Sequence, residues 1–319
     1  MMTKPLLTFI FLCCAFVVWG QGYSSPAAYG TALFNEHALV SNKNMDYLQY
    51  SVHSDDYALI EQKRMELIQQ IQQSLTNVRA MPAYEGDTKL RDEIAAVFEA
   101  YLASFKVEFE QVNVLRRSSK ESYIAMENYL KANSLAEKKL DAASARAGAA
   151  QMAFARKYKL QIEEGEEDSG SKSISQLNDY YRAVFLRVFK LSKKDAEFSD
   201  ALKEQNFGKM DRYRKELDVV CDEHLYFFGK LSDFNGDTAY RDAALALTKF
   251  YKDLAVNGYK TMTDVVRKGD KITNEDVEAF NAVITKLNRE MSPLHDAVNE
   301  AGDQLFKKNV PKPIETRRI

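Results

Sequence analysis

The side chains with the clearest capacity for chemistry lie in one short stretch, Cys221-Asp-Glu-His224, with Asp218 one turn earlier. On a helix, residues three apart are neighbours, so Asp218, Cys221 and His224 share roughly one face. Carboxylate, thiolate and imidazole are all ligands for zinc or copper. The sequence therefore offers these three residues as a candidate metal site. The alternative is a buried cysteine beside a capped or partly exposed histidine. Because no distant ligand cluster can be nominated to complete a site, no cofactor is predicted.

Other catalytic signatures are missing from the sequence. None of the four histidines has a Glu three residues before it, which disfavours a di-iron carboxylate centre of the ferritin type. There is no His-Glu-x-x-His zinc motif, no Gly-x-Ser-x-Gly elbow and no glycine-rich phosphate loop. The sequence favours a protein that is not an enzyme, although an active site built from distant residues would leave no such pattern.

A nine-residue pattern occurs twice, at Tyr84–Asp92 and at Phe234–Asp242. Its glycine can take a positive φ just past a helix C-terminus, and its Asp or the following Thr can cap the next helix. Calcium binding is disfavoured, because Ala244 stands where an EF-hand loop starting at Asp233 needs a Glu. The predicted structural junctions are Gly86, Asp87, Thr88, Gly236, Asp237 and Thr238.

The apolar stripes that follow the two junctions also correspond, for example at Val97 and Leu247 and at Tyr101 and Tyr251. Apolar residues recur at helical spacing, and no segment shows the alternation of a strand. The sequence therefore predicts an all-α fold of two antiparallel helical bundles related by internal duplication.

Residues 1–20 have the organisation of a signal peptide. Lys4 precedes an apolar run from Pro5 to Trp19, which is too short to span a bilayer comfortably, and cleavage is expected before Gln21. A lipoprotein anchored through one of two early cysteines and an uncleaved anchor are the alternatives. The sequence predicts export through the secretory pathway to the periplasm, the outer surface or the extracellular space, with no transmembrane segment after cleavage.

Cleavage would change the cysteine count and the charge. Cys221 would remain as the one cysteine, so no intramolecular disulfide is expected. Of the 44 basic residues only Lys4 is lost, which leaves 43 against 46 acidic residues and a formal net charge of −3. No strong field attracts nucleic acid, and no nucleic-acid partner is predicted.

Composition also predicts the domain organisation. The stretch Glu163–Ser173 is charged, rich in Gly and Ser and without apolar residues, which is typical of a linker. The predicted parts are a signal peptide at 1–20, an extended leader at 21–32, a first bundle at 33–162, the acidic linker at 163–173, a second bundle at 174–310 and a mobile tail at 311–319.

Local signals give helix boundaries within the bundles. Ser118-Ser-Lys-Glu121 resembles a capping box that starts a helix, and a second such pattern predicts a break or a kink in that helix near Asn133. The alanine-rich segment Ala142–Ala155 is expected to pack closely against a neighbour. In the second half, one helix is expected from Asp237 to Arg267. Thr273-Asn-Glu-Asp276 caps another that ends near Lys308 and is bent at Pro293.

The segments Asn178-Asp-Tyr-Tyr181, Phe185–Leu191 and Asp233–Asp242 resemble an uncharacterised family of exported helical surface proteins of bacteroidetes and leptospires. The resemblance implies a location at the cell surface. It gives no information about an activity, because the family has none established. The leading expectation is a non-enzymatic envelope protein with a structural or protein-interaction role and an envelope or extracellular protein partner. The alternative is a binding protein for a small hydrophobic or metal-containing ligand held between helices.

Overall fold

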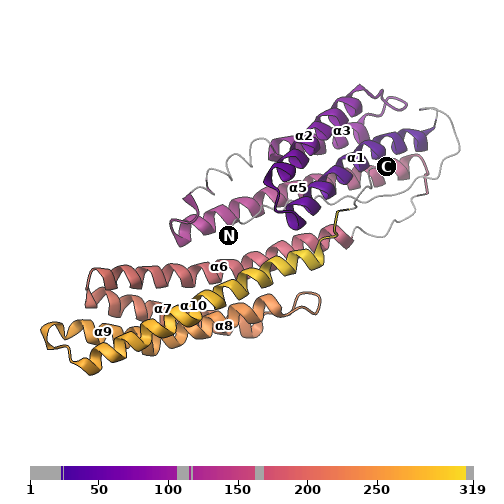
Figure 1. Ribbon diagram of the computed structural model, residues 1–319. Helices are drawn as coiled ribbons and strands as arrows, with labels where there is room; N and C mark the ends of the chain where they lie inside the picture. The colour runs from indigo at the N-terminus through magenta and orange to yellow at the C-terminus, as the bar shows by residue number, and fades with distance from the viewer. Residues whose placement is uncertain (1–22, 24, 106–114, 116–117, 162–168, 314–319) are drawn as a thin grey trace. The chain divides into compact units, whose positions relative to one another are not determined.

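The protein is described by a computed structural model, which covers residues 23, 25–105, 115, 118–161 and 169–313 (Figure 1). In these residues the predicted all-α fold is confirmed, because the regular elements are all helices. The β-bridges found there are isolated and join Tyr84 to Asp87 and Phe234 to Asp237. The elements in chain order are α1 (Pro26–His53), α2 (Tyr57–Ala80), α3 (Lys89–Ala103), α5 (Tyr123–Lys157), α6 (Ser169–Lys203), α7 (Phe207–Lys230), α8 (Ala239–Asp253), the π-helix η3 (Leu254–Gly258), α9 (Tyr259–Arg267), the short η4 (Gly269–Lys271) and α10 (Asn274–Asn309).

The chain divides into two compact units. The N-terminal unit comprises the described residues of 2–119, 128–178 and 309–319, and the C-terminal unit comprises those of 120–127 and 179–308. The division at residue 178 falls within α6. Of the acidic segment expected to link the bundles, residues 163–168 lie outside the described residues and Ser169–Ser173 belong to α6.

In the N-terminal unit, α1 begins earlier than expected. The Ser25 hydroxyl accepts a hydrogen bond of 3.1 Å from the Ala28 amide, and Pro26 follows as the first helical residue. Proline is well tolerated there because its missing N–H has no partner inside the helix. The prediction that an extended leader reaches residue 32 is therefore wrong for residues 26–32, and part of the leader is the first turn of α1.

Helices α1, α2, α3 and the C-terminal part of α5 enclose the core of this unit. Leu33, Leu67, Ile94 and Leu140 are each fully buried there. An aromatic cluster closes one end of the core, where the Tyr29 and Tyr84 ring centroids lie 5.6 Å apart.

Helix α5 starts and continues differently from the sequence prediction. Its cap is Ser122, whose hydroxyl accepts from the Ala125 amide at 3.1 Å, and not Ser118, whose hydroxyl donates to the Leu115 carbonyl. The helix runs continuously from Tyr123 to Lys157, so of the break or kink expected near Asn133 the break is wrong. Asn133 is buried in the unbroken helix.

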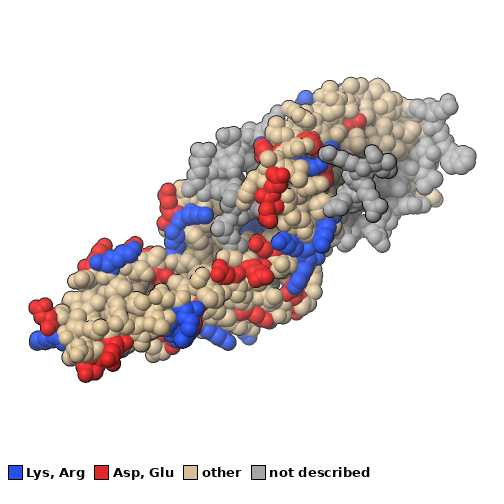
Figure 2. Space-filling view, in the orientation of Figure 1, with Lys and Arg blue, Asp and Glu red and all other residues tan. Residues whose placement is uncertain are grey.

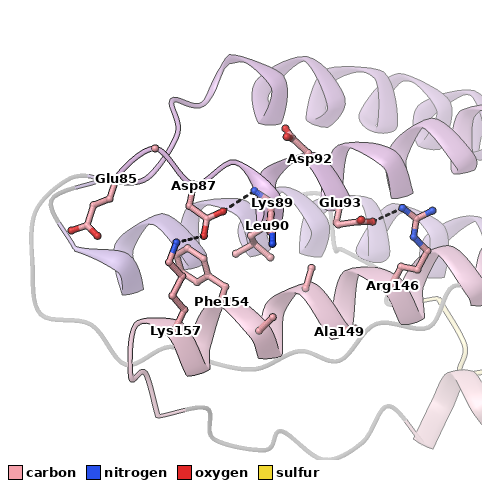
Figure 3. Close-up of a pocket in the computed structure, with 13 residues that line it drawn as sticks. Glu85, Asp87, Lys89, Leu90, Asp92, Glu93, Arg146, Ala149, Phe154 and Lys157 are labelled. Atoms are coloured by element: carbon pink, nitrogen blue, oxygen red, sulfur yellow. Dashed lines mark hydrogen bonds and ion pairs between the residues drawn. The ribbon is translucent and has the colours of Figure 1, made fainter.

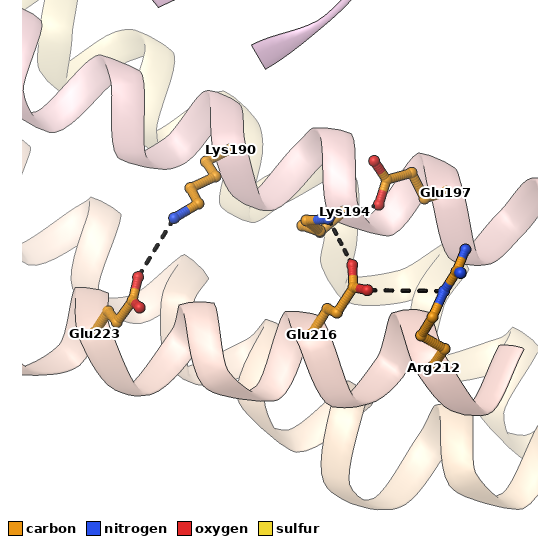
Figure 4. Close-up of polar contacts among 6 residues, drawn as sticks. All are labelled: Lys190, Lys194, Glu197, Arg212, Glu216 and Glu223. Carbon is orange, nitrogen blue, oxygen red and sulfur yellow. Dashed lines mark hydrogen bonds and ion pairs between the residues drawn. The ribbon is translucent and has the colours of Figure 1, made fainter. Parts of the chain in front are cut away.

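In the C-terminal unit, α6 and α7 are joined by ion pairs along their facing surfaces (Figure 4). Lys194 bridges to Glu216 at 2.7 Å and to Glu197 at 2.8 Å, and Lys190 lies 3.3 Å from Glu223. Such partly exposed pairs contribute about 0.2–1 kcal/mol each, so burial of apolar side chains such as Leu191 and Leu217 carries most of the stability.

A π-helical turn interrupts the helix that was expected from Asp237 to Arg267. Helix α8 ends at Asp253, η3 follows and α9 begins at Tyr259. The prediction of one continuous helix is wrong because the apolar spacing of the sequence does not reveal the extra residue that a π-turn accommodates. The corresponding segment of the N-terminal unit is 104–108. Ser104 and Phe105 are also π-helical, and residues 106–108 lie outside the described residues.

Helix α10 begins with the predicted capping box. The Thr273 amide donates to the Asp276 carboxylate at 3.0 Å, and the Asp276 amide donates back to the Thr273 hydroxyl at 3.3 Å. The helix then continues through Pro293 to Asn309. Its buried residues are Val298, Gly302 and Leu305.

Two further observations bear on partners. Lys and Arg side chains alternate with Asp and Glu on the face shown in Figure 2, without a large area of one sign. Among the described residues, no helix combines the length and the apolarity that crossing a bilayer requires. The predicted signal peptide at residues 1–20 lies outside the described residues.

Candidate functional site

The two junction patterns fold into turns of the same geometry. In the N-terminal unit the Tyr84 and Asp87 amides donate to each other's carbonyls at 3.1 and 2.8 Å, and Glu85 and Gly86 have φ of 50° and 81°. The Phe234–Asp237 turn has the corresponding bonds at 3.0 and 2.9 Å and φ of 53° and 80° at Asn235 and Gly236. The positive φ favours glycine. The glycine does not end the preceding helix as expected, because Met81 and Leu231 already end α2 and α7 in extended conformation. It lies in a separate turn.

The aspartate of each turn has two roles. Asp87 accepts 3.0 Å from the Lys89 amide and 2.6 Å from the Lys157 ammonium. Asp237 repeats both contacts, with the Ala239 amide at 2.9 Å and Lys308 at 2.6 Å. The hydrogen bond from the lysine and, to a smaller extent, the hydrogen bond from the backbone amide hold the pKa of each carboxyl below its usual value. Of the two capping residues that the sequence allowed, the structure thus uses the aspartates.

The threonines have a different position. Thr88 and Thr238 are the N-cap residues of α3 and α8, but neither side chain makes a capping hydrogen bond. In the first turn of each of these helices, Arg91 donates to the Met81 carbonyl and Arg241 donates to the Leu231 carbonyl, each at 3.0 Å.

Corresponding contacts relate the rest of the two units. Arg91 and Arg241 lie 150 positions apart, and Lys157 and Lys308 lie 151 positions apart. By the same spacing of 151 positions, Ser144 of α5 corresponds in the sequence to His295 of α10. Their partners correspond as well, because the hydroxyls of Tyr101 and Tyr251 lie 2.8 Å from Ser144 and His295, respectively.

A groove of about 1040 Å³ lies beside the first of these turns, between the start of α3 and the C-terminal part of α5 (Figure 3). Leu90, Ala149, Ala150, Ala153 and Phe154 form its apolar floor. Ala149 and Ala153 are exposed, whereas Leu90 and Phe154 are almost completely buried. The alanine-rich segment therefore packs closely on one side only, and its other side is open.

Charged side chains surround the floor. Asp87 and Lys157 form an ion pair of 2.6 Å at one end, and Glu93 and Arg146 form one of 2.7 Å towards the other. Both pairs join the turn and α3 to α5 (Figure 3). Lys89 also lines the groove. Its ammonium forms no ion pair among the described residues, but its charge helps to lower the pKa of the Asp87 carboxyl.

The groove residues differ from their counterparts in the C-terminal unit. The exposed alanines Ala149 and Ala153 correspond to Glu300 and Gln304, which are longer and polar. On the rim the difference is reversed, because the charged Lys89, Glu93 and Arg146 of the N-terminal unit correspond to Ala239, Ala243 and Ala297. The N-terminal unit thus combines a shortened, apolar floor with an added charged rim.

The proposed metal ligands Asp218, Cys221 and His224 share one face of α7, and each has surroundings that a metal site does not require. The Asp218 carboxylate lies 2.5 Å from the Lys252 ammonium, and Cys221 and His224 are buried. Burial raises the pKa of the Cys221 thiol to about 12 and lowers that of His224 to about 3. Among the described residues, no three side chains of His, Cys, Asp or Glu are grouped so as to hold a metal ion.

Their counterparts in the N-terminal unit are Ile68, Ile71 and Ser74, which are all buried on the same face of α2. The face that carries Cys221 and His224 is therefore a packing face of the helix. The three side chains are of types that bind metals, which is why the sequence suggests a metal site. The local sequence does not show that this face of the helix is buried in the core.

A polar cluster that the sequence did not indicate lies in the interior of the C-terminal unit, next to η3. The Tyr259 hydroxyl donates to the Asp195 carboxylate, and the Tyr251 hydroxyl is 2.8 Å from the His295 ring. Burial raises the pKa of Asp195 and lowers the pKa of His295. At the spacing of 151 positions, Asp195 corresponds to Asn44 of the N-terminal unit. An asparagine side chain does not titrate.

Comparison of the chain with protein-family models, with curated proteins and with solved structures found no match.

Proposed function

We propose that the chain is an exported, non-enzymatic helical protein that binds a ligand in the groove of its N-terminal unit. The observation that carries the proposal is the groove itself, in which an apolar floor lies within a charged rim. Ligand sites in proteins typically combine an apolar lining with a few polar groups that orient the ligand. Export rests on the organisation of residues 1–20, as does the expected location outside the cytoplasm.

The proposal includes an internal duplication that produced two antiparallel bundles. It is supported by the matching turns, by the Arg91 and Arg241 contacts, and by the pairing of Tyr101 with Ser144 and Tyr251 with His295. After duplication the two copies diverged. The N-terminal copy has the groove, and the C-terminal copy has the longer side chains Glu300 and Gln304 at the corresponding positions.

Native mass spectrometry of the protein purified from the organism that exports it tests this function. We expect a polypeptide that begins at Gln21 and carries additional mass, which is lost on denaturation. A variant with Ala149→Glu and Ala153→Gln places the side chains of the other unit on the floor and should lack that mass. Equal bare masses for both proteins, or retention of the ligand by the variant, would contradict the proposed function.

A protein-interaction role is the second candidate, and the outer face of α7 favours it. Val219 and Tyr226 are exposed there to 58% and 73%, whereas their counterparts on α2 are the polar Gln69 and Thr76. Exposed apolar and aromatic side chains are typical of contact surfaces. The test is co-purification of an envelope protein with the wild type and its loss from the Val219→Gln, Tyr226→Thr variant. Equal recovery with both proteins would exclude this face.

A further inference from the structure

The ends of the groove limit the size of what it can hold. The ion pairs Asp87 with Lys157 and Glu93 with Arg146 both reach from the α3 side to α5. Along α5, positions 146 and 157 are separated by about 16 Å at 1.5 Å per residue. A partner helix or extended peptide would have to pass over both pairs, whereas a small molecule fits between them. This inference rests on the proposed ligand-binding function.

The floor selects an apolar body. Between the two ion pairs the accessible surface is formed mainly by the methyl groups of Ala149, Ala150 and Ala153, and the almost completely buried Leu90 and Phe154 add little to it. Apolar contact with such a surface is favourable by roughly 25 cal/mol per Å² removed from water. The floor residues contribute only hydrocarbon side chains, so the part of the ligand that lies on them should also be apolar.

The charges of the rim determine the sign of the head group. The carboxylates of Asp87 and Glu93 and the cations of Lys157 and Arg146 are already paired with each other. The Asp92 carboxylate is held by its neighbour Arg91 at 2.8 Å.

Lys89 is the lining cation whose ammonium remains without an ion pair among the described residues, and it follows the turn directly at the start of α3. Glu85 is the corresponding unpaired carboxylate among the described lining residues, but it lies at the outer end of the groove, beyond Asp87 (Figure 3). The C-terminal unit has Ala239 at the position of Lys89, so this charge belongs to the unit that has the groove.

We propose that the groove binds a small single-chain amphiphile with one anionic head group, which pairs with the Lys89 ammonium while the apolar chain lies on Ala149, Ala150 and Ala153. The amphiphile is held along its length between the two ion pairs. Its anionic group is a carboxylate or a group of similar charge, as in a free fatty acid.

Isothermal titration calorimetry with three probes that share a similar alkyl chain tests this assignment: decanoate, the uncharged decanol and decyltrimethylammonium. The purified protein should bind decanoate, and the affinity for decyltrimethylammonium should be at least about tenfold lower, which corresponds to loss of one charged contact. Lys89→Ala copies the other unit and should weaken decanoate binding about tenfold while leaving decanol binding unchanged. Glu85→Gln is the matched control and should not weaken binding of decanoate.

The outcomes separate the head-group assignment from the proposed function. Preference for decyltrimethylammonium, or no effect of Lys89→Ala, would overturn the anionic ligand while loss of all binding in Ala149→Glu, Ala153→Gln would still support the groove. Equal binding by that filled variant and by the wild type would overturn the groove as the site and the proposed function with it. Failure of the wild type to bind decanoate would overturn the amphiphile, and the native mass experiment then decides about ligand binding in general.

Discussion

At the scale of single residues, the histidines show how burial decides chemistry. His224 is a candidate metal ligand by its type, but its side chain is buried, as is that of His37. Burial disfavours the charged imidazolium and lowers the pKa of each to about 3 from an ordinary value of 6.5. These histidines are therefore neutral parts of the core at physiological pH.

This burial makes stability dependent on pH. The folded-state pKa of His37 lies below the unfolded-state value, so its contribution is complete above about pH 6.5 and is lost as the pH falls towards 3. Between about pH 7 and pH 5 the free energy of unfolding should fall by about 2 kcal/mol on account of His37. His37→Val, which copies Val188 of the other unit, should remove this part of the pH dependence in urea denaturation. An unchanged pH dependence in the variant would contradict the assignment.

The junction glycine provides a second test at this scale. Gly86 has a φ of 81° and open space where a Cβ would lie, so Gly86→Ala introduces backbone strain without a clash. We expect a loss of about 1 kcal/mol in the free energy of unfolding. Gly148 also has open space but lies inside α5, where Gly148→Ala should stabilise the protein by about 0.5–1 kcal/mol. If both variants shift the urea midpoint in the same direction, the strain argument is wrong.

At the scale of elements, the caps decide where helices begin. Ser122 starts α5 in place of the Ser118 pattern that the sequence favoured. Ser122→Ala should therefore cost about 1 kcal/mol, whereas Ser118→Ala, with its longer contact to the Leu115 carbonyl, should cost less. The two variants can be compared by thermal unfolding followed by circular dichroism. A larger effect at Ser118 would place the cap where the sequence suggested.

Much of the helical architecture could be predicted from sequence because apolar periodicity and capping residues act locally. The Thr273 capping box and the caps at Asp87 and Asp237 are examples. Errors arose where a local signal had two structural meanings. Pro26 was assigned to a leader but is also suited to the first turn of a helix.

The candidate groove could not be predicted in this way, because it depends on side chains from two separate parts of the chain. The turn at Asp87 and the alanines of α5 were each noted for structural reasons, one as a cap and the other as a packing surface. Their contact across the Asp87 and Lys157 ion pair requires the tertiary fold. The alignment of Ala149 and Ala153 with Glu300 and Gln304 is a signal in the sequence that could have indicated a cavity.

At the scale of the whole molecule, the chain has two helical units with corresponding turns and ion pairs but different surfaces. The N-terminal unit carries the groove and its charged rim, and the C-terminal unit has buried polar groups around Asp195 and Tyr259. The side chains that distinguish the groove from the corresponding surface of the other unit are few, among them Ala149 and Ala153 in place of Glu300 and Gln304.

The most direct test of the groove is an NMR titration of alanine-methyl-labelled protein with decanoate. The account predicts that the methyl signals of Ala149 and Ala153 shift together and saturably, while that of Ala301 in the other unit stays in place. The same titration with the Lys89→Ala variant should move the same signals at higher decanoate concentration. Saturable shifts confined to the C-terminal unit, near Cys221 and His224, would contradict the central claim that the ligand site lies between α3 and α5.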